Sequence, residues 1–259
     1  MAMNFIDTHA HLDGTEFDAD RHDVVMRARA AGVDRVFIPA IDLASVKSVI
    51  SVCDAYPDFA FPMIGLHPEE VKSDYREVLA RMRQMISPRF IAVGEVGLDY
   101  YWSREFENEQ IEAFDEQVRW AVEYRKPLMI HCRKAQHEMV SVLKRYGKDL
   151  CGGVFHCFTG NEKEAEELLR FEGFALGIGG VVTFKKSHLP EVLSNAVPLN
   201  RIVLETDSPY MAPVPVRGRR NESSFVKYVL EKVAASYGVP PETVAEATND
   251  CVRSIFGDC

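Results

Sequence analysis

The chain has 259 residues and a formal net charge of −9, and 47% of its residues are apolar. A chain of this length buries enough surface to fold without disulfides or a structural metal. Its composition excludes disordered, collagen-like and low-complexity proteins. The acidic balance argues against a protein that coats nucleic acid through bulk positive charge. An enzyme that takes one strand end into a locally basic cleft remains compatible with it.

Neither a membrane span nor a signal peptide is expected. The longest runs without a charged residue, 150–161 and 173–184, fall short of the roughly 18 residues that a span requires. No basic segment precedes the first apolar run. The six cysteines form no C-x-x-C pair, so free thiols in a cytoplasmic protein are the simplest interpretation.

Short apolar or β-branched runs alternate with segments of helical periodicity along the whole chain. The ends of the runs lie about 20 to 37 residues apart, which is the length of one strand–helix unit. Eight such units predict a (β/α)8 (TIM) barrel, whereas the rival, an open doubly wound sheet, usually has about six strands. The predicted strands are Phe5–His9, Arg35–Ala40, Ala60–Leu66, Phe90–Glu95, Pro127–Cys132, Gly153–Phe158, Phe174–Ile178 and Arg201–Glu205.

Between the strands, apolar residues recur at helical spacing. Val24, Ala28 and Ala31, for example, lie at i, i+4 and i+7 and would share one face of a helix. A last segment, Pro240–Phe256, starts with proline and predicts an extra C-terminal helix. No linker or shift of composition divides the chain, so we predict a single barrel domain over residues 1–259.

The strongest local signal is the sequence Asp7-Thr8-His9-Ala10-His11 at the end of the first predicted strand. Because alternate residues of a strand share a face, His9 and His11 are expected to point the same way and to hold one metal ion. Asp7 shares that parity and is expected to orient a ligand. For this motif alone, two incidental histidines are the alternative.

Four other predicted strands also end in residues that bind metals: Glu95, His131, His156 and Asp207 stand at the ends of the fourth, fifth, sixth and eighth strands. In a TIM barrel the carboxyl ends of all strands meet at one mouth. Charged side chains in apolar strands are costly unless they are paired or bound to metal. A shared metal site therefore explains the pattern better than chance does.

Six ligands are too many for one tetrahedral ion and suit two divalent ions ~3.5–4 Å apart. The carboxylate of Glu95 has two oxygens and is the natural bridge. The other five are predicted to divide between the ions, with His9, His11 and Asp207 on one and His131 and His156 on the other. Such ligands accept Zn, Mn, Fe, Co or Ni more readily than Mg. The identity of the ions stays open, with Zn, Mn, Mg, Co and Ni as candidates.

Seven motifs follow one another along the chain: Asp7–Asp13, Gly65–Pro68, Gly94–Tyr101, His131–Arg133, His156–Gly160, Leu204–Tyr210 and Val216–Glu222. In their order and spacing they resemble the TatD family of metal-dependent deoxyribonucleases, over nearly the whole chain. One departure is that Cys132 follows His131 where the family often has serine. Because strand parity turns Cys132 toward the helices, this departure affects no site residue.

The resemblance implies an amidohydrolase-like barrel that hydrolyses DNA phosphodiesters, trimming single strands from a 3′ end. It implies that the six ligands bind metal, that Asp207 is essential and that His67 is a further active-site histidine. In the wider amidohydrolase group a carbamylated lysine often stands at strand four, and Glu95 takes that place here unmodified. No obligate protein partner is expected, and the protein is predicted to be a monomer.

Further residues near the mouth are candidates for contacts with the substrate. His67 ends the third predicted strand and is expected to contact the substrate or its leaving group. Arg133 follows the fifth strand and is placed to hold a phosphate. Arg217 and Arg219 follow the eighth strand, where TIM barrels often bind phosphate. For each arginine, a surface salt bridge or a solvated charge is the alternative.

Four other features near the mouth carry expectations. The aromatic run Tyr100–Trp102 is explained equally by base stacking and by packing beneath the loop. Glu205 is expected in a structural ion pair rather than on a metal. Cys132 and Cys157 alternate with ligand histidines, so both are expected to pack outward against the helices.

The predicted reaction is hydrolysis of a phosphodiester by a water that the two cations activate, with Asp207 as general base and His67 assisting the departing oxygen. A second interpretation keeps every ligand but changes the bond to an aminoacyl-tRNA ester, an amide, a lactone or a phosphotriester, because fold and metals do not select the electrophile. A third is a non-catalytic metal-binding protein, in which protein ligands would fill every coordination position.

Overall fold

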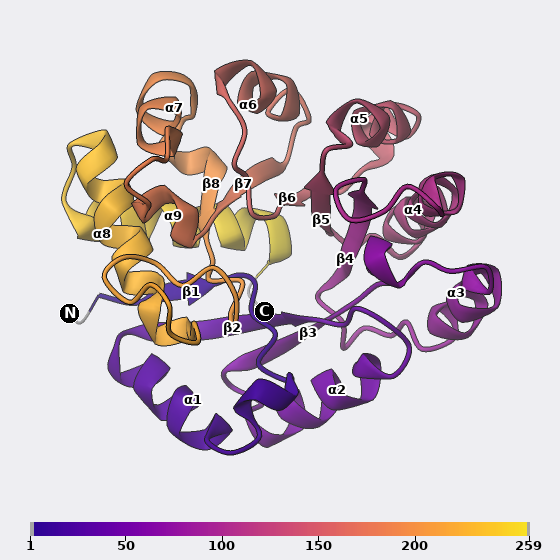
Figure 1. Cartoon of the computed structure of the whole chain (residues 1–259), viewed down its shortest axis with the longest axis horizontal. Coiled ribbons are helices and arrows are strands. Elements are labelled where there is room, and N and C mark those ends of the chain that lie inside the picture. The colour runs from indigo at the N-terminus through magenta and orange to yellow at the C-terminus, as the bar shows by residue number, and fades with distance from the viewer. Residues whose placement is uncertain (1–2, 258–259) are drawn as a thin grey trace.

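A computed structural model describes residues 3–257, in which eight parallel strands alternate with helices (Figure 1). The order of the strands in the sheet follows their order in the chain. The predicted TIM barrel is confirmed, and each predicted strand overlaps one observed strand. The strands are β1 Phe5–Asp7, β2 Val33–Pro39, β3 Ala60–Ile64, β4 Ala92–Asp99, β5 Leu128–Arg133, β6 Gly153–Phe155, β7 Phe174–Ile178 and β8 Ile202–Leu204.

Backbone hydrogen bonds between the ends of β1 and β8 close the cylinder. The amide of Thr8 donates to the carbonyl of Leu204 at 3.0 Å, and the amide of Asp207 donates to the carbonyl of His9 at 2.9 Å. A parallel bridge between Ala10 and Ser208 continues this contact. Closure through these residues fixes the two chain segments that follow β1 and β8 against each other.

Nine α-helices surround or close the barrel in the part of the chain that the structure describes (Figure 1). The predicted C-terminal helix is present as α9. None of these helices is long and apolar enough to cross a membrane. The helices are α1 Arg21–Ala30, α2 Ser45–Ala55, α3 Tyr75–Arg83, α4 Glu107–Tyr124, α5 Gln136–Lys144, α6 Glu162–Leu168, α7 Leu189–Ala196, α8 Val226–Tyr237 and α9 Pro241–Phe256.

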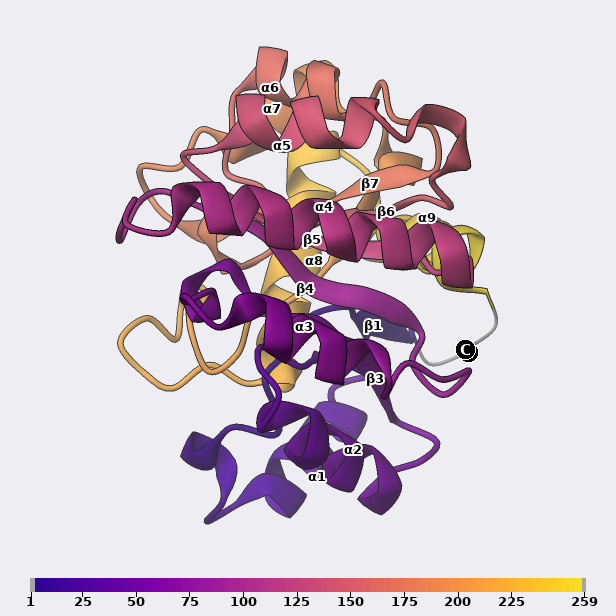
Figure 2. The same ribbon diagram turned by 90° about the vertical axis from the view of Figure 1, so that its right-hand side faces the viewer.

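The interior of the barrel is filled with apolar side chains at its amino-terminal end. Helix α9 covers this end, where Cys251 and Val252 join the interior cluster and the ring of Phe256 lies 5.0 Å from that of Phe37. In Figure 2, α9 lies at the right and the orange loop between β8 and α8 projects at the left. The buried histidines and carboxylates of the barrel interior lie instead at the carboxyl ends of the strands. Each strand supplies one residue to the interior cluster: Ile6, Phe37, Met63, Ala92, Met129, Val154, Ala175 and Val203.

Two buried glutamines of α4 fix the backbone at the mouth. Gln117 accepts a hydrogen bond from the amide of Leu66 at 2.7 Å and donates one to its carbonyl at 3.2 Å. Gln110, two turns earlier on the same helix, makes the same pair of bonds with Asp99, at 2.9 and 3.2 Å. These bonds satisfy buried peptide groups at the ends of β3 and β4 that the sheet leaves unpaired.

Replacing Gln117 by alanine should destabilise the protein, because the amide and carbonyl of Leu66 would be left buried without partners. At about 1–3 kcal/mol for each unpaired group, we expect a loss of about 2–6 kcal/mol in the free energy of unfolding, measured by urea denaturation. Gln84→Ala, at the exposed end of α3, is the control and should change it by less than about 0.5 kcal/mol. Equal effects of the two substitutions would contradict the proposed role of Gln117.

Candidate metal centre

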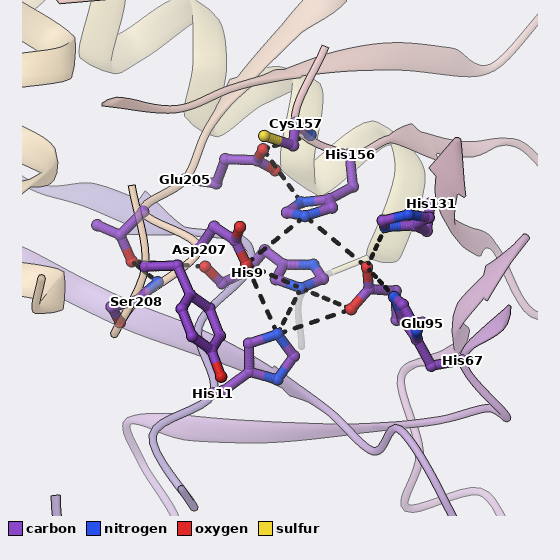
Figure 3. A network of polar contacts seen from close by, with 12 residues as sticks. His9, His11, His67, Glu95, His131, His156, Cys157, Glu205, Asp207 and Ser208 are labelled. Carbon is purple, nitrogen blue, oxygen red and sulfur yellow. Dashed lines mark hydrogen bonds and ion pairs between the residues drawn. The ribbon is translucent and has the colours of Figure 1, made fainter. Parts of the chain in front are cut away.

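The carboxylate of Glu95 lies at the middle of a cluster of histidines at the mouth of the barrel (Figure 3). Glu95 stands in β4, and the residue is 2% exposed. Its Oε2 lies 3.1 Å from Nε2 of His9 and 3.7 Å from Nε2 of His11. Its Oε1 lies 3.0 Å from Nδ1 of His131 and 3.3 Å from Nε2 of His67. The two oxygens therefore face two different groups of nitrogen atoms.

Asp207 completes the group on the Oε2 side. Its Oδ1 lies 3.6 Å from Nε2 of His11 and 3.9 Å from Nε2 of His9, and the two histidine nitrogens are 3.4 Å apart. Ligand atoms about 2.1 Å from one tetrahedral ion are themselves separated by ~3.4 Å. This group has the spacing and the donor chemistry that a divalent cation requires.

On the Oε1 side, His131 and His156 face Glu95 from β5 and from the end of β6. Nε2 of His156 lies 3.8 Å from Oε1 of Glu95 and 3.7 Å from Oδ1 of Asp207. The structure thus brings together all six residues that the sequence predicts as ligands. It also places His67 against the same oxygen of Glu95, so this side offers three imidazoles.

His9 and His156 lie so close together that two positive charges on their rings would repel each other strongly. The rings of His9 and His156 stack at 3.5 Å with an angle of 18° between them. Burial and the neighbouring His156 lower the pKa of His9. Although burial opposes it, the carboxylates of Glu205, Asp207 and Glu95 raise the pKa of His156 to about 10. A bound cation would relieve this crowding, because it takes neutral imidazoles as ligands.

Over nearly its whole length the chain is similar to known proteins. The family model of TatD related DNase matches residues 6–257. An uncharacterized metal-dependent hydrolase, YabD of Bacillus subtilis, is 36% identical over 251 residues, covering 96% of this chain and 98% of its own.

The chain belongs to the TatD-related DNase family. Membership confirms the predicted resemblance and the enzyme class, a metal-dependent hydrolase. The 3′-5′ ssDNA/RNA exonuclease TatD of Rahnella sp. is 34% identical over 252 residues, covering 95% of each chain. The crystal structure of the TatD homologue YjjV from Escherichia coli aligns over all of both chains with a TM-score of 0.89 and 29% identity. The TatD fold therefore extends over the whole of this chain.

In this TatD-family centre, two buried carboxylates lie on the far side of two imidazoles that are predicted to bind metal. Oδ2 of Asp99 lies 2.8 Å from Nε2 of His131, leaving Nδ1 to face Glu95. Oε1 of Glu205 lies 3.1 Å from Nδ1 of His156 and accepts a hydrogen bond from the amide of Cys157 at 2.6 Å. Such partners orient a ligand and raise its basicity. Glu205 thus forms the ion pair expected of it.

The sequence analysis missed Asp99 because it ended the fourth strand at Glu95. In the structure β4 continues to Asp99, whose carboxylate is buried beside His131, a predicted ligand. The extra pairing between β4 and β5 reaches as far as Arg133. A signal was present in the sequence, since Glu95, Gly97 and Asp99 alternate and strand parity puts them on one side.

At the strand ends, Asp7 contacts the predicted ligand His9 only through its backbone, and the expectation for Cys157 is wrong. The carboxylate of Asp7 accepts hydrogen bonds from the amide and hydroxyl of Thr206, at 2.9 and 2.7 Å, and from the amide of His9 at 3.4 Å. It therefore fixes backbone rather than an imidazole ring. Cys157 faces the centre, with its Sγ within 4.8 Å of ligand atoms of His156 and Asp207. Strand β1 ends at Asp7 and strand β6 ends at Phe155, so the alternation of a strand does not extend to the residues that follow. Cys157 in addition has a φ of +49°. Cys132 packs on the outer core, as expected.

His67 differs from the other histidines of the centre in its hydrogen bonding. Its Nδ1 accepts a hydrogen bond from the amide of Glu69 at 3.1 Å and caps the short helical turn Pro68–Glu70. The neutral ring then carries its proton on Nε2, which faces Glu95. This arrangement suits a proton donor better than a metal ligand.

The predicted substrate arginines lie outside the cluster of ligands. The guanidinium of Arg133 lies 3.6 Å from the centre of the Tyr101 ring. Arg217 lies 4.0 Å from the centre of the Phe184 ring and donates to the carbonyl of Ala212 at 3.2 Å, and Arg219 is exposed. Among the described residues, none of the three arginines pairs with a carboxylate. Their charges are therefore available to an anion.

Binding of a divalent ion to the metal-free protein should release protons. Although burial opposes it, the carboxylates of Asp99 and Glu95 raise the pKa of His131 to about 9. The pKa of His156 is raised to about 10. Both rings are therefore protonated at pH 8 and must become neutral to bind metal. Titration calorimetry with Zn²⁺ in buffers of different ionisation enthalpy should show release of about two protons per chain. Heats that do not depend on the buffer would contradict this expectation.

Asp99→Asn should weaken metal binding about 10- to 100-fold, because the amide cannot hold the proton of His131 as a carboxylate does. The measurement is competition between the protein and a chromophoric chelator. Asp58→Asn, an exposed substitution away from the centre, is the matched control and should leave the affinity unchanged. An unchanged metal affinity in Asp99→Asn would contradict the proposed role of Asp99 in orienting His131.

Proposed function

We propose that the chain is a two-metal exonuclease that removes nucleotides from the 3′ end of a nucleic acid single strand. The observation that carries the proposal is the position of Glu95, whose two oxygens face separate groups of histidine nitrogens at 3.0–3.8 Å. This is the arrangement of a carboxylate that bridges two cations. The printed name of the Rahnella relative, a 3′-5′ ssDNA/RNA exonuclease, supports the choice of substrate and polarity.

We assign the ligands as the sequence predicts them. His9, His11 and Asp207 would hold one ion, His131 and His156 would hold the other, and Glu95 would contribute to both. Two divalent ions there supply Lewis acidity, which activates a water and neutralises charge on a phosphodiester. Zn, Mn, Co and Ni suit this mixture of imidazole and carboxylate better than Mg.

Asp207 is the proposed general base. Although burial opposes it, His11, His156 and His9 hold the pKa of Asp207 below its usual value, so the carboxylate is ionised at neutral pH. Asp207 is partly exposed at the mouth, whereas Glu95 is buried. Asp207 can therefore accept a proton from a water that reaches the centre.

The proposed role of His67 is to protonate the departing oxygen. Its hydrogen bond from Glu69 fixes the tautomer in which Nε2 carries the proton. Nε2 lies 3.3 Å from Oε1 of Glu95, so the proton is carried at the edge of the centre, where a departing oxygen would lie. Arg133, Arg217 and Arg219 are proposed to bind phosphates of the strand, since their charges have no carboxylate partner among the described residues.

One chain supplies every residue of this centre, so we propose that it works as a monomer. The described cysteines are all free, which supports a reducing compartment, the cytoplasm. A local group of arginines at the mouth offsets the acidic net charge where the strand would bind.

The test compares the unaltered enzyme with Asp207→Asn on 3′- and 5′-labelled single strands. Metal-depleted protein is reloaded with one ion at a time before the assay. We expect stepwise shortening from the 3′ end, sensitivity to a chelator, and a fall in kcat of about 100-fold or more for Asp207→Asn, with unchanged thermal unfolding. Asp58→Asn is the control. Cleavage of charged tRNA, amides, lactones or phosphotriesters, but not of strands, would refute the nuclease and favour another hydrolase.

A further inference from the structure

An exposed group of rings and one guanidinium lies beside the centre, on the loop after β4 and at the end of β5. Trp102 is 65% exposed and Tyr101 is 51% exposed, whereas Tyr100 is buried. Trp102 is the most exposed of the large apolar side chains described. Packing beneath the loop therefore explains Tyr100 but not the two residues that follow it.

Arg133 joins the two exposed rings into one surface. Its guanidinium lies 3.6 Å from the centre of the Tyr101 ring and 5.3 Å from that of Trp102, and the two rings meet edge to face at 4.9 Å. Among the described residues no carboxylate pairs with Arg133. The surface thus combines aromatic faces with an uncompensated positive charge, the combination that binds single-stranded nucleic acid.

The surface is tied directly to the metal centre through Asp99. One oxygen of its carboxylate lies 2.8 Å from the ligand His131. The other accepts hydrogen bonds from the amides of Tyr101 at 2.8 Å and Trp102 at 3.4 Å. The backbone of Arg133 lies opposite that of Asp99 in the ladder between β4 and β5, two residues beyond His131. The backbone segment that carries the two rings is therefore tied to the centre.

We propose that Trp102, Tyr101 and Arg133 form a stacking platform for a nucleobase of the substrate strand. The base stacks on the rings, and Arg133 contacts an adjoining phosphate. The alternative is that these residues bind another protein. The closeness of the platform to the centre, and the lack of a counter-ion for Arg133 among the described residues, favour a nucleic acid strand. This inference rests on the proposed exonuclease function and adds a binding site for bases that do not react.

Binding can be measured without cleavage, because the chain has two tryptophans and the other, Trp120, is fully buried. A phosphorothioate hexanucleotide, which resists hydrolysis, is added to the metal-loaded enzyme. We expect quenching of tryptophan fluorescence that is absent in Trp102→Phe and weak with an abasic strand of equal charge. No quenching, or equal quenching by the abasic strand, would overturn the platform. Quenching without cleavage of any strand would instead refute the exonuclease and leave the platform in place.

Kinetics separate a base-binding role from a structural one. Losing one stacked base should raise KM of Trp102→Ala about 5- to 150-fold on a DNA single strand, with kcat and thermal unfolding unchanged. Trp102→Phe should restore most of the affinity, and Tyr124→Ala, a partly exposed ring at the far end of α4, should behave as the unaltered enzyme. Hydrolysis of bis(p-nitrophenyl) phosphate, which carries no nucleobase, should be the same in all four proteins. A fall in kcat, or a change of oligomeric state in Trp102→Ala without a change in KM, would overturn the proposal.

Discussion

The rest of the structure depends on a carboxylate, Glu95, that is buried where no water can compensate its charge. Taking an ion out of water costs several kcal/mol unless opposite charge surrounds it. Although burial opposes it, His67, His9 and His131 hold the pKa of Glu95 well below its usual value. Glu95 therefore stays ionised and gathers four chain segments around itself. The barrel makes this possible, because it brings strands that are distant in sequence to one rim and fills its opposite end with apolar side chains.

Helix α4 controls this centre without contributing a ligand. Its buried glutamines Gln110 and Gln117 hold the peptide groups of Asp99 and Leu66, and Asp99 in turn holds the ring of His131. Each hydrogen bond in this series pairs a buried polar group, which would destabilise the fold if it were left unpaired. The same bonds that stabilise the contact between α4 and the barrel thus set the direction of a ligand nitrogen. In this region the interactions that stabilise the fold are therefore also the ones that preorganise the centre.

The sequence was sufficient for the barrel and for the residues at the strand ends, because both follow from strong local patterns. Helical and strand periodicity alternate, and His9, Glu95 and His156 interrupt apolar runs at the same end of each unit. It was insufficient where backbone direction changes, since strand parity holds only while the strand lasts. Cys157 turns toward the centre at a positive φ, which no pattern of residue types announces. Asp99 was missed for the converse reason, because β4 is longer than its apolar run.

The acidic charge of the molecule and a nucleic acid substrate are compatible because the two act over different distances. At physiological salt a net charge is screened beyond about 8 Å, so a strand end at the mouth responds mainly to the groups that it touches. There, the uncompensated guanidinium of Arg133 and the exposed ring of Trp102 lie next to the centre. Repulsion by the remaining surface opposes indiscriminate coating of nucleic acid. Under the proposed function, an acidic protein with a small basic and aromatic rim would thus favour a strand end over the body of a duplex.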